Sequence, residues 1–154
     1  MDLSDVITPE AILPSLKANS KKQALQAIAE KAAAMTGVEE RDIFETLVKR
    51  EKLGSTGVGG GIAIPHGKLA KLDRIFGMFA RLPKPIDFEA LDETPVDLIF
   101  LLLAPETAGA DHLKALARIA RLFREPGVAG KLRASSDASA LYSVLTESAA
   151  DHAA

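Results

Sequence analysis

Apolar and polar positions follow a helical period at both ends of the chain and a strand-like pattern in its middle. Residues 20–37 carry one apolar stripe, and Ser20 with Gln23 forms a capping-box pattern at its start. Gly37 follows at the point where a left-handed residue would end the helix. A second helix is predicted over about 39–53, because acidic residues begin it and basic residues end it, as the helix dipole favours.

The middle of the chain favours strands and tight turns. Residues 54–67, with the sequence GSTGVGGGIAIPHG, contain six of the 11 glycines, which disfavours a helix there. Two strand-like runs follow at 74–82 and 96–103, separated by a loop with three prolines. The second run is almost continuously apolar from Leu98, as expected of a central strand that is covered on both faces.

The helical period returns after Pro105. Asp111 is expected to cap the next helix. The inward stripe of this helix is expected to consist of Leu113, Leu116, Ala120 and Phe123. A short helix to about Arg133 and a last helix over roughly 137–148 complete the expected elements.

The order of these elements predicts the fold class. Helices, then strands, then helices indicate a single α/β domain over residues 1–148, with a mixed β-sheet sandwiched by helices. A chain of 154 residues is long enough to bury a substantial core without disulfides or metals. Residues 149–154 have little to pack and are expected to form a flexible tail.

The composition leaves histidine, carboxylate, hydroxyl and backbone groups as sources of chemistry. The chain has no cysteine, which excludes disulfides, thiolate nucleophiles, cysteine-type zinc sites and iron–sulfur clusters. With 19 basic and 21 acidic residues its net charge is -2, which argues against nucleic-acid binding through bulk electrostatics. The first residues lack the basic start and apolar run of an export signal, and no apolar stretch approaches the about 20 residues that span a bilayer. We therefore expect a cytoplasmic protein with no nucleic-acid partner and no membrane insertion.

The glycine-rich segment leads to a histidine. It matches neither the phosphate-binding loop G-x-x-x-x-G-K-[ST] nor the dinucleotide fingerprint G-x-G-x-x-G, because Leu69 and Ile62 occupy positions where these motifs need other residues. His66 follows a short apolar run and stands between Pro65 and Gly67, so the chain presents an imidazole at the end of a strand beside free backbone donors. Two interpretations stay open: a histidine in a turn after an edge strand, or a nucleophile that takes a phosphoryl group on one ring nitrogen.

A phosphoryl group on His66 would need cationic or N–H groups nearby, because it brings about 1.5 to 2 negative charges. Arg50, at the end of the second predicted helix, could reach it, although an arginine there also suits the helix dipole. Ser55 and Thr56 could donate hydroxyl hydrogen bonds, although both residue types also favour turns. Gly67 is a further candidate contact for the phosphoryl group.

The remaining histidines and charges are less distinctive. His112 opens the helix after Pro105, where the positive helix end favours a nearby anion; an exposed first-turn histidine is the alternative. His152 lies in the tail and is given no function. A basic face of the same helix is either solvated or able to receive an acidic partner; it consists of Lys114, Arg118, Arg121 and Arg124. No histidine pair has zinc-motif spacing and the carboxylates are scattered, so no metal, no cofactor and no glycosidase pair is expected.

The segment REKLGSTGVGGGIAIPHGK resembles the active-site signature of the fructose/mannitol-type IIA domains of the bacterial phosphotransferase system. The positions that fit this pattern are Glu51, Val58, Gly59, Ile62, Ala63, Ile64, Pro65, His66 and Gly67. The resemblance extends through Asp111-His112-Leu113 over nearly the whole chain, and the run R-E-x-L-G-S-T-G is typical of the nitrogen-related branch, IIA-Ntr. Gly60 departs from the pattern, which often has Asn at this position.

The resemblance implies a histidine phosphocarrier. His66 would accept a phosphoryl group from the phosphohistidine of a small HPr-like carrier, called NPr in this branch, with Arg50 and His112 supporting the phosphorylated ring. Proteins of the branch usually regulate targets such as potassium-transport systems and sensor kinases rather than moving sugar. Two alternatives stay open: a sugar-specific IIA component that donates to a fructose or mannitol IIB domain, and a non-catalytic partner-binding module.

Overall fold

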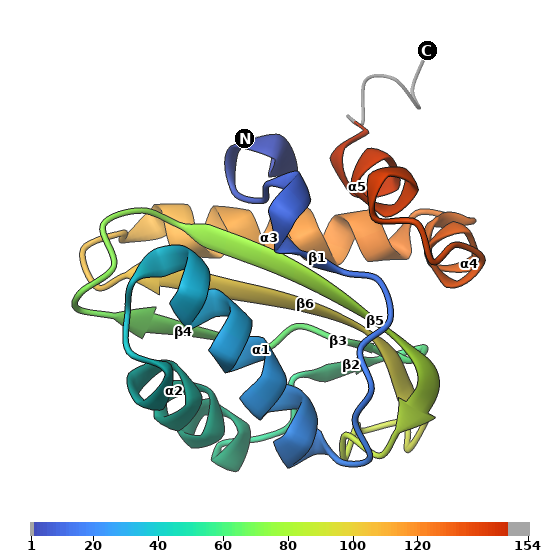
Figure 1. Cartoon of the computed structure of the whole chain (residues 1–154), viewed down its shortest axis with the longest axis horizontal. Coiled ribbons are helices and arrows are strands. Elements are labelled where there is room, and N and C mark those ends of the chain that lie inside the picture. Colours follow the sequence, from blue (N-terminus) through green and yellow to red (C-terminus); the bar gives the residue numbers. More distant parts are fainter. Residues whose placement is uncertain (1, 148–154) are drawn as a thin grey trace.

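The computed structural model describes residues 2–147, which form a six-stranded mixed sheet with helices on both sides (Figure 1). The strands are β1 (Ile12–Leu13), β2 (Gly57–Gly59), β3 (Ile62–Ala63), β4 (His66–Leu69), β5 (Phe76–Ile86) and β6 (Val96–Pro105). The helices are α1 (Lys21–Thr36), α2 (Glu40–Lys52), α3 (Ala110–Arg124), α4 (Val128–Arg133) and α5 (Ala138–Thr146), and two short 3-10 helices, η1 (Leu3–Asp5) and η2 (Pro9–Ala11), precede them.

Strand β6 is the centre of the sheet. It pairs antiparallel with β5 on one side and parallel with both β3 and β4 on the other, where β3 lies opposite Leu98 and Ile99 and β4 begins opposite Leu102. Strand β1 adds to the far side of β5, and β2 adds to β3. All residues of β6 but one are buried, which confirms the predicted central strand.

The helices cover the two faces of this sheet. Helices α1 and α2 lie on one side and α3 on the other, with α4 and α5 near the end of α3 (Figure 1). From α3, Phe123 packs against Phe79 of β5 and Phe100 of β6, with ring centroids 6.5 and 6.4 Å apart. The predicted α/β sandwich is therefore confirmed. Within residues 2–147, every helix falls short of the length and apolar character needed to cross a bilayer.

The first two helices match their predictions closely. At the start of α1, the Ser20 hydroxyl accepts a hydrogen bond from the N–H of Gln23 at 3.2 Å, and Gly37 ends the helix with a φ of 78°. Only half of the expected capping box forms, because the Gln23 side chain accepts from the N–H of Asn19 at 2.8 Å rather than from Ser20. The bounds of α2 lie within one residue of the expected range.

Helix α3 faces the sheet with a different stripe from the one predicted. Gly109 is its N-cap, so Asp111 lies in the first turn and is not the cap. Leu113 is 66% exposed, and the prediction that it points inward is wrong. The buried residues are His112, Ala115, Arg118, Ile119, Leu122 and Phe123. Two of these, His112 and Arg118, are polar. A stripe predicted from hydrophobicity alone therefore lies on a different side of the helix from the face that is buried.

The strands and the C-terminal end also differ in detail. The prediction ended this strand at residue 82, but β5 continues through two prolines to Ile86. Proline has no N–H to donate, and it is tolerated here because β1 pairs only with Phe79 and Ala80 and the pairing with β6 is irregular after Arg81. The sequence pattern did not reveal β1, whose two residues are too few to show a period. Helices α4 and α5 confirm the two short helices predicted there. The predicted tail, 149–154, lies outside the described residues.

Candidate active site

Three elements bring Arg50, His66 and His112 together. Arg50 lies in the last turn of α2, His66 is the first residue of β4, and His112 lies in the first turn of α3. Strand β4 is attached to the buried strand β6: the N–H of Leu102 donates to the carbonyl of Pro65 at 2.9 Å. The imidazole therefore stands at the start of a strand, not at the end of one as expected, and a buried neighbouring strand fixes its backbone.

Hydrogen bonds fix the tautomer of His66. Its Nδ1 lies 2.8 Å from the carbonyl oxygen of Ile64, and since a carbonyl only accepts, Nδ1 carries the proton. Nε2 therefore holds the lone pair, and the Nε–H of Arg50 donates to it at 3.3 Å. A second group of Arg50, Nη1, donates to the carbonyl of Gly54 at 2.8 Å, which holds the guanidinium beside the ring. The nitrogen that is available for nucleophilic attack is thus Nε2, next to a permanent positive charge.

The environment of His66 keeps its ring neutral. Its pKa lies below the ordinary value of 6.5, chiefly because burial disfavours the imidazolium form. The charge of Arg50 lowers this pKa as well, whereas the hydrogen bond to Ile64 and the charge of Glu51 raise it. A neutral imidazole has the lone pair that nucleophilic attack requires, so the site is prepared for this chemistry near neutral pH.

His112 faces the ring of His66. The two ring centroids are 5.8 Å apart and the ring planes are tilted by 52°. His112 is only 8% exposed, so it is not an exposed first-turn histidine. Its pKa is lowered, first by burial and then by the positive charges of neighbouring side chains. Its Nδ1 is buried and has no hydrogen-bond partner among residues 2–147, which is rare for a buried polar atom and places an unused polar group beside His66.

A buried glutamate joins the site to the first helix. Glu51 accepts from the Thr56 N–H at 3.0 Å and from the Thr56 hydroxyl, and it pairs with the ammonium of Lys21 at 2.8 Å. Its side chain is 6% exposed. The Lys21 ammonium also lies 4.8 Å from the centre of the Phe88 ring. The motif marked Glu51 but not its role, and no local pattern in the sequence signals its pairing with Lys21.

The three other predicted phosphate contacts have structural roles. The Ser55 hydroxyl donates to the carbonyl of Phe88 at 2.8 Å and accepts from the Gly57 N–H at 3.0 Å. The Thr56 hydroxyl is engaged by Glu51, as described above. Gly67 permits close packing of β4 on α2, because a Cβ there would lie 2.5 Å from Cγ2 of Thr46. Contact of these three residues with a phosphoryl group stays a prediction.

The position of Gly60, where the family pattern often has Asn, accommodates either residue. Gly60 has a φ of 66°, a left-handed conformation that asparagine adopts more readily than most residues, and a Cβ there would meet nothing within 4 Å. The turn is held by its backbone: the Gly60 N–H donates to Asp92 at 3.0 Å, and its carbonyl accepts from Arg133 at 2.6 Å. The glycine therefore removes no contact that the backbone of this turn needs.

The expected basic face of α3 does not form as one surface. Arg118 is only 9% exposed, while Lys114, Arg121 and Arg124 are exposed. One guanidinium nitrogen of Arg118, Nη1, is buried without a hydrogen-bond partner in the described part of the chain. Across residues 2–147, no group of three or more His, Asp or Glu side chains is arranged to hold a metal ion.

Comparison with known proteins decides the family. The family model described as phosphoenolpyruvate-dependent sugar phosphotransferase system, EIIA 2, matches residues 5–148. The chain belongs to this EIIA 2 family. The resemblance seen in the sequence is therefore confirmed.

Relatives of this EIIA 2 chain include regulatory and sugar-specific proteins. A nitrogen regulatory protein of Bradyrhizobium diazoefficiens is 69% identical over 145 residues, which are 94% of this chain and 95% of that protein. The crystal structure of the nitrogen regulatory protein IIA-Ntr from Neisseria meningitidis has a TM-score of 0.89 and 35% identity, over 94% of this chain and 99% of that one. A phosphotransferase-system fructose-specific EIIA component of Haloferax volcanii is 34% identical over 151 residues, 96% of this chain and 98% of that protein.

Proposed function

We propose that the protein is a histidine phosphocarrier and that Nε2 of His66 accepts the phosphoryl group. The observation that carries this proposal is the arrangement around one ring: Ile64 holds the proton on Nδ1 while Arg50 donates to the free Nε2. A lone pair beside a fixed cation suits attack on an anionic phosphoryl group, because the cation neutralises charge as the group arrives. The protein contributes mainly position and charge.

The proposed phosphoryl transfer needs no separate acid or base. The N–P bond of a donor phosphoimidazolium breaks, and its electron pair stays on the donor ring, which leaves as neutral imidazole. The lone pair of His66 Nε2 forms the new N–P bond, and Nδ1 keeps its proton on the carbonyl of Ile64. Arg50, which donates to Nε2 before the transfer, is proposed to contact the incoming group. His112 offers its Nδ1, which has no partner among residues 2–147, as a further polar group beside it.

The donor in this proposal is a phosphorylated HPr-like carrier, NPr. Incubation with phosphoenolpyruvate, the upstream enzyme and NPr should give one acid-labile phosphoryl group on each chain. Variant His66→Ala should accept none, while His152→Ala, a matched histidine loss in the C-terminal residues, should be labelled like the wild type. Equal labelling of His66→Ala and the wild type would show that the site is elsewhere.

The output in this proposal is regulatory, and the location is the cytoplasm. The relatives named nitrogen regulatory proteins support this reading. The proposed target classes, which the family resemblance of the sequence implies, are potassium-transport systems and sensor kinases. Phosphorylation adds about 1.5 to 2 negative charges to a chain of net charge -2, enough to change binding to a charged partner. Binding of both forms to each candidate target tests it, because equal affinities would exclude regulation by phosphorylation there.

A second candidate function is a sugar-specific IIA component that donates to a IIB domain. The fructose-specific relative favours it, and the chemistry at His66 would be the same. Labelling rates with NPr and with the HPr of the sugar system separate the two, because the regulatory function predicts faster labelling by NPr. A non-catalytic partner-binding module, in contrast, would show no labelling by either carrier.

A further inference from the structure

A hollow separate from the His66 site opens between the two helices on one side of the sheet. Its volume is about 700 Å³, and it lies between the first turns of α1, one side of α2 and the loop that follows α2. This volume falls within the range of about 300 to 1,000 Å³ that proteins use for small ligands. The residues that line it include neither His66 nor Arg50.

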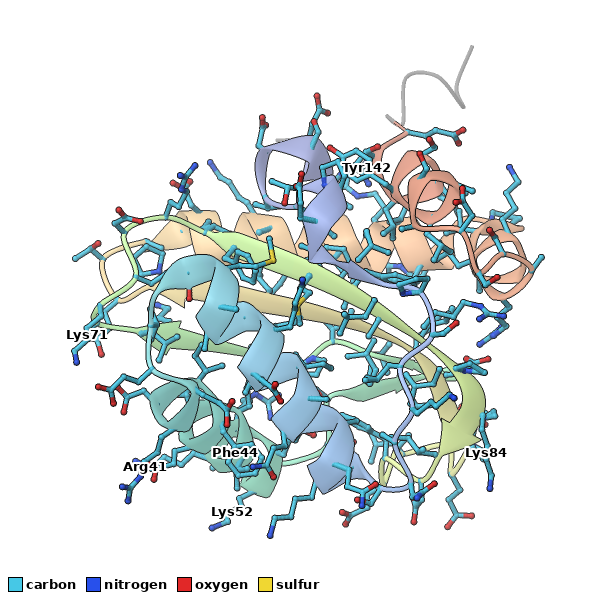
Figure 2. All side chains as sticks on the ribbon, viewed as in Figure 1. Arg41, Phe44, Lys52, Lys71, Lys84 and Tyr142 are labelled. Carbon is cyan, nitrogen blue, oxygen red and sulfur yellow. The ribbon has the colours of Figure 1, made fainter. Side chains whose placement is uncertain are left out.

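The inner wall of this hollow is apolar. Leu25 of α1 and Phe44 and Val48 of α2 line it. Leu25 is buried, whereas Phe44 and Val48 are half-buried, so part of their apolar surface is open to a ligand. Figure 2 shows Phe44 and Lys52 projecting from α2 near the lower end of α1. A hydrocarbon or aromatic body would gain most by covering this wall.

The rim of the hollow carries more positive than negative charge. Three lysines and two glutamates line it. Lys21 is already paired with Glu51 at 2.8 Å. Among residues 2–147, no acidic group forms an ion pair with Lys22 or Lys52, which leaves these two ammonium groups for an anion. Lys22 also lies in the first turn of α1, at the positive end of the helix dipole.

We propose that this hollow binds a small organic anion, with its carboxylate, sulfonate or phosphate group between Lys22 and Lys52 and its apolar or aromatic body against Phe44 and Val48. The positive rim and the apolar wall together select this class: a purely polar anion leaves the wall uncovered, and a neutral apolar molecule leaves both ammonium groups without a partner.

The hollow is connected to the His66 site through a wall residue. Glu51 lines the hollow and divides its carboxylate between Lys21 and Thr56, and it follows Arg50 directly in α2. An anion between Lys22 and Lys52 also attracts the ammonium of Lys21, which lines the same hollow and is paired with Glu51. The ion pair between Lys21 and Glu51 is then weakened, which changes the electric field at His66. This field matters because the charge of Glu51 raises the pKa of His66. Binding therefore alters the rate of phosphoryl uptake, a consequence that rests on the proposed function.

Anilinonaphthalene sulfonate is a suitable probe, because it joins an aromatic body to one negative charge. Titration into the full chain, followed by amide chemical shifts, should show saturable one-site binding centred on the backbone of α1, α2 and Ser55. The double variant Lys22→Gln/Lys52→Gln should bind about tenfold more weakly. The double variant Lys71→Gln/Lys84→Gln has the same change in charge at opposite edges of the molecule (Figure 2) and should bind like the wild type. Neutral phenylnaphthylamine should bind more weakly than the sulfonate.

Three results overturn the site: binding that does not saturate, shifts centred elsewhere, or equal loss of affinity in both double variants. The link to His66 is measured separately, as the rate of phosphoryl uptake with and without saturating probe. An unchanged rate overturns the link but not the site. Because binding is read without phosphorylation, a chain that binds the probe but accepts no phosphoryl group contradicts the proposed function alone.

Discussion

The guanidinium of Arg50 donates a hydrogen bond to the ring nitrogen of His66 that carries no proton, at 3.3 Å. The two residues lie on different elements, the last turn of α2 and the first position of β4, and a second hydrogen bond from Arg50 to Gly54 fixes the angle of approach. In the proposed function, the nucleophile and the charge that receives the phosphoryl group are therefore in position before a donor arrives.

Variant Arg50→Gln is expected to slow phosphoryl uptake by about a hundredfold, because it removes the fixed positive charge beside Nε2. It should also raise the pKa of His66, since the Arg50 charge lowers that pKa. Initial labelling rates and an NMR titration of the His66 ring measure the two effects. Arg41→Gln is the matched control, because Arg41 is an exposed arginine of the same helix whose one ion pair within residues 2–147 is with Glu45. Equal rates in both variants would remove Arg50 from the mechanism.

Acid is expected to destabilise the folded chain through its two described histidines. Both have a pKa below 6.5 in the fold, so the unfolded chain binds more protons between the folded value and about 6.5. Their contribution to stability is complete above about pH 6.5 and is lost as the pH falls through the pKa values of the folded state. Urea unfolding at about pH 7.5 and about pH 5 should show a smaller loss for His66→Gln/His112→Gln than for the wild type. An equal loss in both proteins would contradict the assigned direction.

Variant Glu51→Gln is expected to lower the stability of the fold by about 3 kcal/mol, because the ammonium of Lys21 then loses its partner in a largely buried position. The pKa of His66 should fall, since the charge of Glu51 raises it. Denaturant unfolding and ring titration report these changes. The double variant Lys21→Met/Glu51→Gln should lose less stability than the sum of the single variants, and strict additivity would argue against the ion pair.

Variant Gly67→Ala is expected to cost about 1–3 kcal/mol, because the new methyl group would meet Cγ2 of Thr46 at 2.5 Å. Thr46→Ser removes that methyl group and should recover much of the loss in the double variant. Thermal unfolding of the four proteins measures the coupling. If Thr46→Ser gives no recovery, the role of Gly67 is not the packing of β4 against α2.

The sequence predicted those features that short-range pattern controls. The helix ends at Ser20 and Gly37 and the buried strand β6 follow from local periods and caps, and the motif marks Arg50 and His66 together. Lys21 and Glu51 lie far apart in the chain, and only the packing of α1 against α2 brings them into contact.

A pattern based on hydrophobicity does not predict which polar residues are buried in the core. His112 and Arg118 are both buried on α3, and the pattern assigned the inward positions to apolar neighbours such as Leu113. For the same reason, the hydrophobic pattern did not show that His112 faces His66 with a nitrogen that has no hydrogen-bond partner among residues 2–147. Burial of a polar side chain depends on what surrounds it in space, and that information is not local.

In the proposed transfer, the group that selects the reacting nitrogen of His66 is a main-chain carbonyl, that of Ile64. A carbonyl of the backbone has no pKa in the physiological range, cannot be removed by exchanging a side chain, and keeps its direction as long as the chain takes the same path. The regiochemistry of the proposed transfer therefore depends on the course of the backbone between β3 and β4. Mutations of nearby side chains are expected to change the rate of transfer without changing which atom reacts.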